Sequence, residues 1–72
     1  MSKIRVGIIG CGQIAQHHMR TYTEISEAEM VVCCDLNREA AEKASQTYNI
    51  PNVETDFRAV LNRDDIDAVD VC

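Results

Sequence analysis

The sequence has no long apolar run and no closely spaced cysteine pair, and each absence excludes a class of protein. Its longest apolar run, Met30 to Cys34, is five residues long, whereas a membrane-spanning helix needs about 20. Its four cysteines include no C-x-x-C spacing, which argues against a zinc site and a disulfide framework. We therefore expect reduced thiols in a cytoplasmic protein without a membrane or metal partner.

Acidic residues are absent from the first 23 positions, although the chain has twelve of them and a net charge of −5. This first segment has a charge of +3, from Lys3, Arg5 and Arg20, and the remainder has a charge of −8. A segment that receives a phosphate is expected to lack carboxylates, because a nearby anion opposes binding. Chance in a short window is the alternative. The acidic remainder argues against a nucleic-acid partner, which requires a basic surface.

A glycine motif dominates the N-terminal part of the chain. Gly10-x-Gly12-x-x-Ala15 follows the apolar segment Val6–Ile9, and Asp35 comes twenty positions after Ala15. This arrangement is typical of a dinucleotide-binding βαβ unit. Gly10 permits a tight turn, Gly12 leaves room for a pyrophosphate, and Ala15 lets the helix pack closely on the strand. Helix N–H groups would bind the phosphate, and the acid would accept hydrogen bonds from a ribose.

Hydrophobic periodicity predicts seven elements in the order β-α-β-α-β-α-β. We expect strands over residues 4–9, 29–35, a short segment near 53, and 66–72, and helices over 13–25, 38–48 and 57–61. Asn37 is the expected N-cap of the second helix, and Thr55 or Asp56 that of the third. The predicted fold class is α/β, a Rossmann-type parallel sheet with strand order 3-2-1-4 and right-handed crossovers.

Side-chain environments can also be predicted from these elements. Cys33 and Cys34 should point to opposite faces of a strand, and a thiolate at Cys11 would be stabilised by the helix N-terminus. His17 and His18 diverge on a helix, so we expect His18 near the sheet and His17 exposed. The residues expected in the core are Ile14, Ala15, Met19, Tyr22 and Ile25 of the first helix, with Tyr48 and Phe57.

With these segments placed, the chain resembles the start of the glucose–fructose oxidoreductase, inositol dehydrogenase and rhizopine-catabolism (Gfo/Idh/MocA) family. The resemblance rests on Val6–Ala15, His18, Val32–Asp35 and Asp67–Val69. It implies an NAD(P)-dependent oxidoreductase that acts on a sugar, cyclitol or related polyol and forms homo-oligomers through a second domain. The family's Glu-Lys-Pro motif and later histidine match no residue here, so the chain contains no predicted catalytic residue and should not catalyse a reaction alone.

The resemblance also indicates a cofactor site. By position, Gly10, Gly12, Gln13 and Ile14 would surround the pyrophosphate, and Asp35 would bind the adenosine ribose. A carboxylate at that place favours NAD over NADP, although Arg38 could bind a 2′-phosphate and leaves NADP as an alternative. The complete set of expected cofactor-binding residues is Gly10, Cys11, Gly12, Gln13, Ile14, Asp35, Asn37 and Arg38.

The topology of a parallel sheet predicts that the domain is incomplete. Ligands of parallel sheets bind beyond the carboxyl ends of strands, so the loop after the fourth strand should line the site. We expect residues 1–72 to be the N-terminal portion of an NAD(P)-binding Rossmann domain, with the rest of that domain and a C-terminal substrate domain absent. Two alternatives are a non-catalytic dinucleotide-sensing or regulatory protein, and a flavin or nucleoside-cofactor enzyme on a related scaffold.

Overall fold

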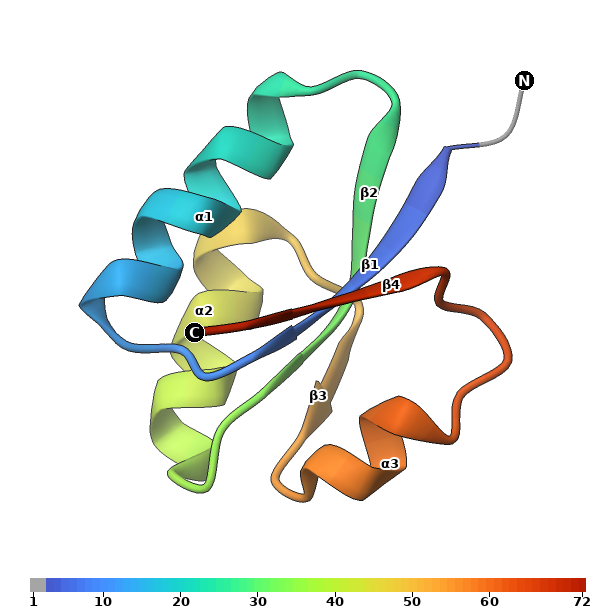
Figure 1. The fold of residues 1–72 in the computed structure, drawn as a ribbon. Coiled ribbons are helices and arrows are strands. Elements are labelled where there is room, and N and C mark those ends of the chain that lie inside the picture. The colour runs from blue at the N-terminus through green and yellow to red at the C-terminus, as the bar shows by residue number, and fades with distance from the viewer. Residues whose placement is uncertain (1–2) are drawn as a thin grey trace.

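The computed structural model describes residues 3–72, in which strands and helices alternate as predicted (Figure 1). The elements are β1 (Ile4–Ile9), α1 (Gln13–Glu24), β2 (Ala28–Cys34), α2 (Arg38–Tyr48), β3 (Asn52–Glu54), α3 (Phe57–Leu61) and β4 (Ala68–Val71). Strand β4 is shorter than predicted. The N–H groups of Asp67 and Cys72 nevertheless donate to the carbonyls of Arg5 and Ile9, so its pairing with β1 extends slightly beyond both ends.

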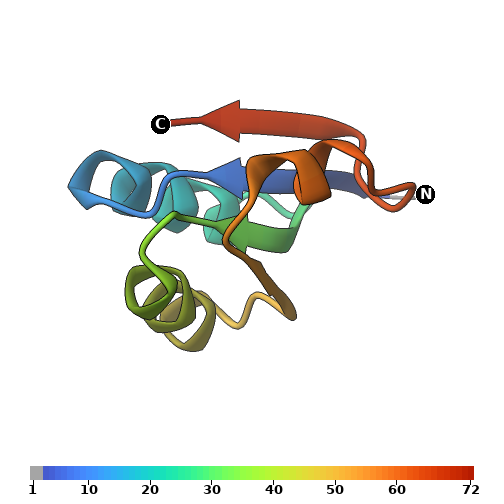
Figure 2. The ribbon, with the colours of Figure 1, turned by 90° about the horizontal axis from the view of Figure 1, so that it is seen from below.

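The four strands form one sheet with the order β3-β2-β1-β4, and every neighbouring pair is parallel. This order confirms the sequence-based prediction. Figure 2 shows β1 and β4 side by side and running in the same direction. Because all four strands are parallel, their carboxyl ends lie at the same edge of the sheet, where the turns into α1, α2 and α3 begin.

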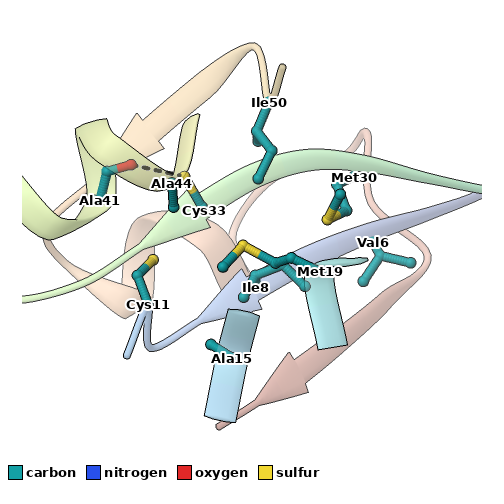
Figure 3. Close-up of a cluster of buried hydrophobic side chains, with 10 residues drawn as sticks. All are labelled: Val6, Ile8, Cys11, Ala15, Met19, Met30, Cys33, Ala41, Ala44 and Ile50. Carbon is teal, nitrogen blue, oxygen red and sulfur yellow. Dashed lines mark hydrogen bonds between the residues drawn. The ribbon is translucent and has the colours of Figure 1, made fainter. Parts of the chain in front are cut away.

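Helices cover both faces of the sheet, and each face has its own core (Figure 1). Helices α1 and α2 pack on one face over the larger core, which consists of Val6, Ile8, Cys11, Ala15, Met19, Met30, Cys33, Ala41, Ala44 and Ile50 (Figure 3). Helix α3 packs on the other face over Val32, Cys34 and Val60. Cys33 and Cys34 therefore face opposite layers, as predicted.

Side-chain caps begin the second and third helices. The Asn37 side chain accepts hydrogen bonds from the N–H groups of Glu39 and Ala40 at the start of α2. Asp56 accepts one from the N–H of Arg58 at the start of α3. Such caps satisfy N–H groups that lack an acceptor within the helix. Asn37 is thus confirmed as an N-cap, and Asp56 rather than Thr55 takes that position in α3.

Three predicted core side chains are exposed instead. Ile14 is 69% exposed, Ile25 is 39% exposed and Phe57 is 51% exposed. Ala15 and Met19 take the inner side of α1, and Ile14 is rotated from Ala15 by about 100°, the angle between successive helical residues. Phe57 stands at the first position of the short helix α3, at the carboxyl edge of the sheet. No helix within residues 3–72 is long and apolar enough to cross a membrane.

Candidate functional site

The turn from β1 into α1 is built around Gly10. Its φ of 96° lies in a region that residues with a side chain rarely adopt. A Cβ atom at this position would also stand 2.8 Å from the carbonyl oxygen of Cys72, the residue after β4. The conformation and the close approach of a neighbouring chain segment therefore both require a glycine at this position.

Gly12 is the N-cap of α1 and has a different environment. Its backbone is extended, it makes no side-chain cap, and the first turn of α1 contains no acidic residue. A Cβ atom at Gly12 would meet no protein atom within 4 Å. The first N–H groups of a helix lack intrahelical acceptors and carry partial positive charge. The first backbone N–H groups of α1 are consequently available as hydrogen-bond donors, and the space next to Gly12 is open.

Asp35 follows β2 and ties two turns of this edge together. One carboxylate oxygen accepts a hydrogen bond from the N–H of Cys11 at 2.8 Å, and the other accepts one from the N–H of Asn37 at 2.9 Å. A carboxylate has about four lone-pair sites, so each oxygen retains the capacity to accept another hydrogen bond. The motif places Asp35 near the glycine turn, but its bond to the backbone of Cys11 was not foreseen.

The side chain of Cys11 points into the core rather than toward the open edge (Figure 3). It is 5% exposed, and its thiol contacts the carbonyl of Cys34 at 3.5 Å. A hydrogen bond with Cys33, and then burial, hold the pKa of the Cys11 thiol well above its usual value. The expectation that the helix N-terminus stabilises a thiolate here is wrong, because burial and the neighbouring thiol outweigh the helix dipole.

The other expected site residues lie around the same edge. Gln13 and Ile14, in the first turn of α1, are both exposed. Asn37 uses its side-chain oxygen to cap α2. Arg38 is exposed, and its guanidinium stands 4.0 Å from Glu42. Asp35 is hydrogen-bonded to the glycine turn through the N–H of Cys11 and to the start of α2 through the N–H of Asn37. Arg38 lies beside them on the α2 side.

An apolar hollow adjoins Asp35. It has a volume of about 350 Å³. The residues that line it are Ile9, Gly10, Cys34, Asp35, Leu36, Thr55 and Phe57. Leu36 is 91% exposed, and Phe57 offers half of its surface. The sequence predicts Phe57 in the core and assigns no role to Leu36, so neither residue is expected at this site. The available signal was position, because each follows the carboxyl end of a parallel strand, where ligands bind.

The two histidines of α1 have different surroundings. His17 is exposed, whereas the Nδ1 of His18 lies 2.8 Å from Asp70 of β4, which confirms the predicted placements. Tyr22 donates a hydrogen bond to the same carboxylate oxygen at 2.9 Å. Burial alone would raise the pKa of Asp70, but the hydrogen bonds from His18 and Tyr22 outweigh it and lower that pKa. Burial, followed by the charge of Asp70, raises the pKa of Cys72 to about 11.

Residues 4–72 match the Gfo/Idh/MocA family, described as an oxidoreductase family with an NAD-binding Rossmann fold. Among curated relatives, D-apiose dehydrogenase of Paraburkholderia graminis is 30% identical over 71 residues, covering 99% of this chain and 19% of the relative. Inositol 2-dehydrogenase 4 of Saccharopolyspora erythraea is 37% identical over 68 residues, covering 93% and 20%.

A solved structure shows the same likeness. Myo-inositol dehydrogenase from Lactobacillus casei, in complex with NAD(H) and myo-inositol, superposes with a TM-score of 0.92 at 35% identity. The match covers 97% of this chain and 21% of that enzyme. The chain thus spans about a fifth of the length of the relatives that it matches.

Proposed function

The chain belongs to the Gfo/Idh/MocA oxidoreductase family, and we propose that it binds the ADP half of a nicotinamide dinucleotide. One observation carries this proposal: three features lie side by side along one edge of the sheet. They are the uncapped N-terminus of α1, the Asp35 carboxylate and an apolar hollow. These three features match the diphosphate, the ribose and the adenine of the nucleotide in order. The turn at Gly10 places the first of them next to the second.

Each part of the site suits one part of the nucleotide. The diphosphate would accept hydrogen bonds from the first N–H groups of α1 in the space in front of Gly12. The ribose hydroxyls would donate to the lone pairs that Asp35 does not use for Cys11 and Asn37. Adenine would occupy the hollow between Leu36 and Phe57, where its ring replaces water on apolar surface.

The charge of Asp35 gives the site a preference for NAD. A 2′-phosphate on the adenosine ribose would bring a second anion next to this carboxylate, so NADP would bind less well. The guanidinium of Arg38, at the start of α2, is directed to Glu42 instead. The Arg38 side chain would have to turn toward Asp35 before it could neutralise the charge of a 2′-phosphate. NADP is therefore the secondary candidate.

We further propose that residues 1–72 are the N-terminal portion of a Rossmann domain in an oxidoreductase for a sugar, cyclitol or related polyol. The dehydrogenases named above support this substrate class, and the share of their length that the chain matches supports additional domains. The nicotinamide would exchange a hydride with the substrate. The proton-transfer groups, the substrate contacts and a homo-oligomer interface would lie in those additional domains. A cytoplasmic location suits the four free thiols.

Substitution of Asp35 by asparagine tests the role of the carboxylate. In the full-length protein, Asp35→Asn should weaken NAD binding about 10-fold or more, because a hydrogen bond to a charged group is worth about 1.5–3 kcal/mol. NADP binding should be unchanged or stronger, because the repulsion of the 2′-phosphate is removed. Calorimetric titration with both nucleotides measures this change in preference.

Glu39→Gln is the matched control, since it also removes one negative charge, but from the first turn of α2. This variant should retain the preference of the wild type. An equal loss of NAD and NADP affinity in Asp35→Asn would mean that the carboxylate only supports the Cys11 turn, and not a ribose. Absence of nucleotide binding by the wild-type protein would overturn the proposed function as a whole.

A further inference from the structure

A second group of polar side chains joins α1 to β4 outside the proposed nucleotide contacts. His18 comes from the middle of α1, Asp70 lies within β4, and Cys72 follows directly after it. One ligand atom from each residue lies within 4.8 Å of the others. Tertiary structure creates this group, because His18 is more than 50 residues from its partners in sequence.

The separations within the group resemble those between zinc ligands. The Cys72 sulfur lies 3.6 Å from the Nδ1 of His18 and 3.6 Å from the Oδ1 of Asp70. Zinc bonds of about 2.0–2.3 Å in a tetrahedron place nitrogen or oxygen about 3.5 Å from sulfur. The His18–Asp70 distance of 2.8 Å is shorter because these two groups share a hydrogen bond. A small rotation of the imidazole would open space for an ion.

We propose that His18, Asp70 and Cys72 form a binding site for Zn²⁺ or a similar borderline-soft divalent cation. Imidazole and thiolate ligands suit zinc, whereas Mg²⁺ and Ca²⁺ prefer oxygen ligands. On binding, zinc replaces the proton of the Cys72 thiol, which passes to solvent. The proton that the Nδ1 of His18 donates to Asp70 moves to Nε2 by a change of tautomer, which frees the Nδ1 lone pair for the ion. Three protein ligands leave the fourth tetrahedral position to water.

The surroundings supply two further features of a metal site. The Tyr22 hydroxyl donates to Asp70 at 2.9 Å and so orients the carboxylate, as outer hydrogen bonds do around metal ligands. An open hollow of about 370 Å³ gives an ion access from solvent. Its lining residues are His18, Thr21, Tyr22, Ile25 and Asp70.

A metal titration tests the site without a nucleotide. The reduced full-length protein, freed of metal by a chelator, is titrated with zinc against a chromogenic chelator, and with Co²⁺ in a spectrophotometer. We expect one ion per chain and a thiolate-to-cobalt charge-transfer band. Loss of an outer hydrogen-bond partner typically weakens metal binding about 10–100-fold, and we expect about 10-fold for Tyr22→Phe. His18→Gln and Cys72→Ser each remove a ligand and should weaken zinc binding by more than that range.

His17→Gln is the matched control, because it removes an exposed histidine from the adjacent position of α1. Its zinc affinity should equal that of the wild type, and circular dichroism establishes that each variant is folded. A wild type that takes up no zinc, or a His18→Gln variant that retains the full affinity, would overturn the proposal. Zinc held by Cys11, Cys33 or Cys34 would give the second result. Nucleotide titration of the same proteins is a separate readout, so failure of the metal site is distinct from failure of the dinucleotide site.

Discussion

Gly10 and Gly12 lie two residues apart, but they lack a side chain for different reasons. Gly10 has a φ of 96° and approaches Cys72, so Gly10→Ala should lower the free energy of unfolding by about 1–3 kcal/mol. Gly12→Ala meets no protein atom and should cost less than about 1 kcal/mol, as a poorer N-cap. It should nevertheless weaken dinucleotide binding, because its methyl group occupies the space proposed for the diphosphate.

Urea denaturation and NAD titration of both variants separate these effects. The stability loss should be larger for Gly10→Ala, while Gly12→Ala should lose affinity with little change in the urea midpoint. If Gly12→Ala destabilised the protein as much as Gly10→Ala, the open environment described for Gly12 would be incorrect.

Single residues were predictable where one conformation or spacing determines them. The motif located the tight turn at Gly10 and placed Asp35 at the same edge of the sheet. The inward direction of the Cys11 thiol was not predictable, because it depends on Cys33 and Cys34 of another strand. The hydrophobicity of Phe57 predicts a core position, but the side chain is exposed because it stands at the very start of α3.

Helices and strands were predictable to within a few residues because their signals are local. Alternation of apolar segments with polar turns located β1 and α2, and Asn37 marked the start of α2. The inner face of α1 was less well defined. The predicted apolar face, which includes Ile14 and Ile25, is wider than the observed one, since only Ala15 and Met19 of this helix are buried.

An ion pair connects the beginnings of β1 and β4 and should make stability depend on pH. The backbone N–H and the guanidinium of Arg5 donate to the Asp67 carboxylate at 2.8–3.2 Å. The side-chain hydrogen bonds from Arg5, and then the backbone bond, lower the pKa of Asp67. Deprotonation of Asp67 is therefore easier in the folded state. Its contribution to stability is complete above the ordinary aspartate pKa of about 4 and is lost as the pH falls through the lowered value.

Asp67→Asn should accordingly lower stability at neutral pH and flatten the decline of the unfolding free energy in acid. Urea denaturation at a series of pH values from neutral to strongly acidic measures both effects. Asp64→Asn is the control, since Asp64 takes part in none of the ion pairs found among residues 3–72. An acid decline as steep in Asp67→Asn as in the wild type would show that other carboxylates cause it.

For the molecule as a whole, the strand order could be predicted because few topologies satisfy parallel pairing with right-handed crossovers. The β3-β2-β1-β4 order followed from that rule and from the glycine motif. Side-chain groups formed by distant segments could not be predicted in this way. The approach of His18 to Asp70 and Cys72 depends on the exact register of β4 beside β1, which sequence periodicity does not specify.

The adjacent cysteines of β2 provide a built-in reporter of local opening. Cys33 lies in the large layer under α2, where its thiol contacts the carbonyl of Ala41 at 3.3 Å (Figure 3). Cys34 lies in the smaller layer under α3. Layers with less buried apolar surface open at lower cost, so iodoacetamide in mild urea should alkylate Cys34 before Cys33. Peptide mass spectrometry resolves the order once rates are normalised to the unfolded chain. Equal normalised rates would instead mean that the two layers open together as one cooperative unit.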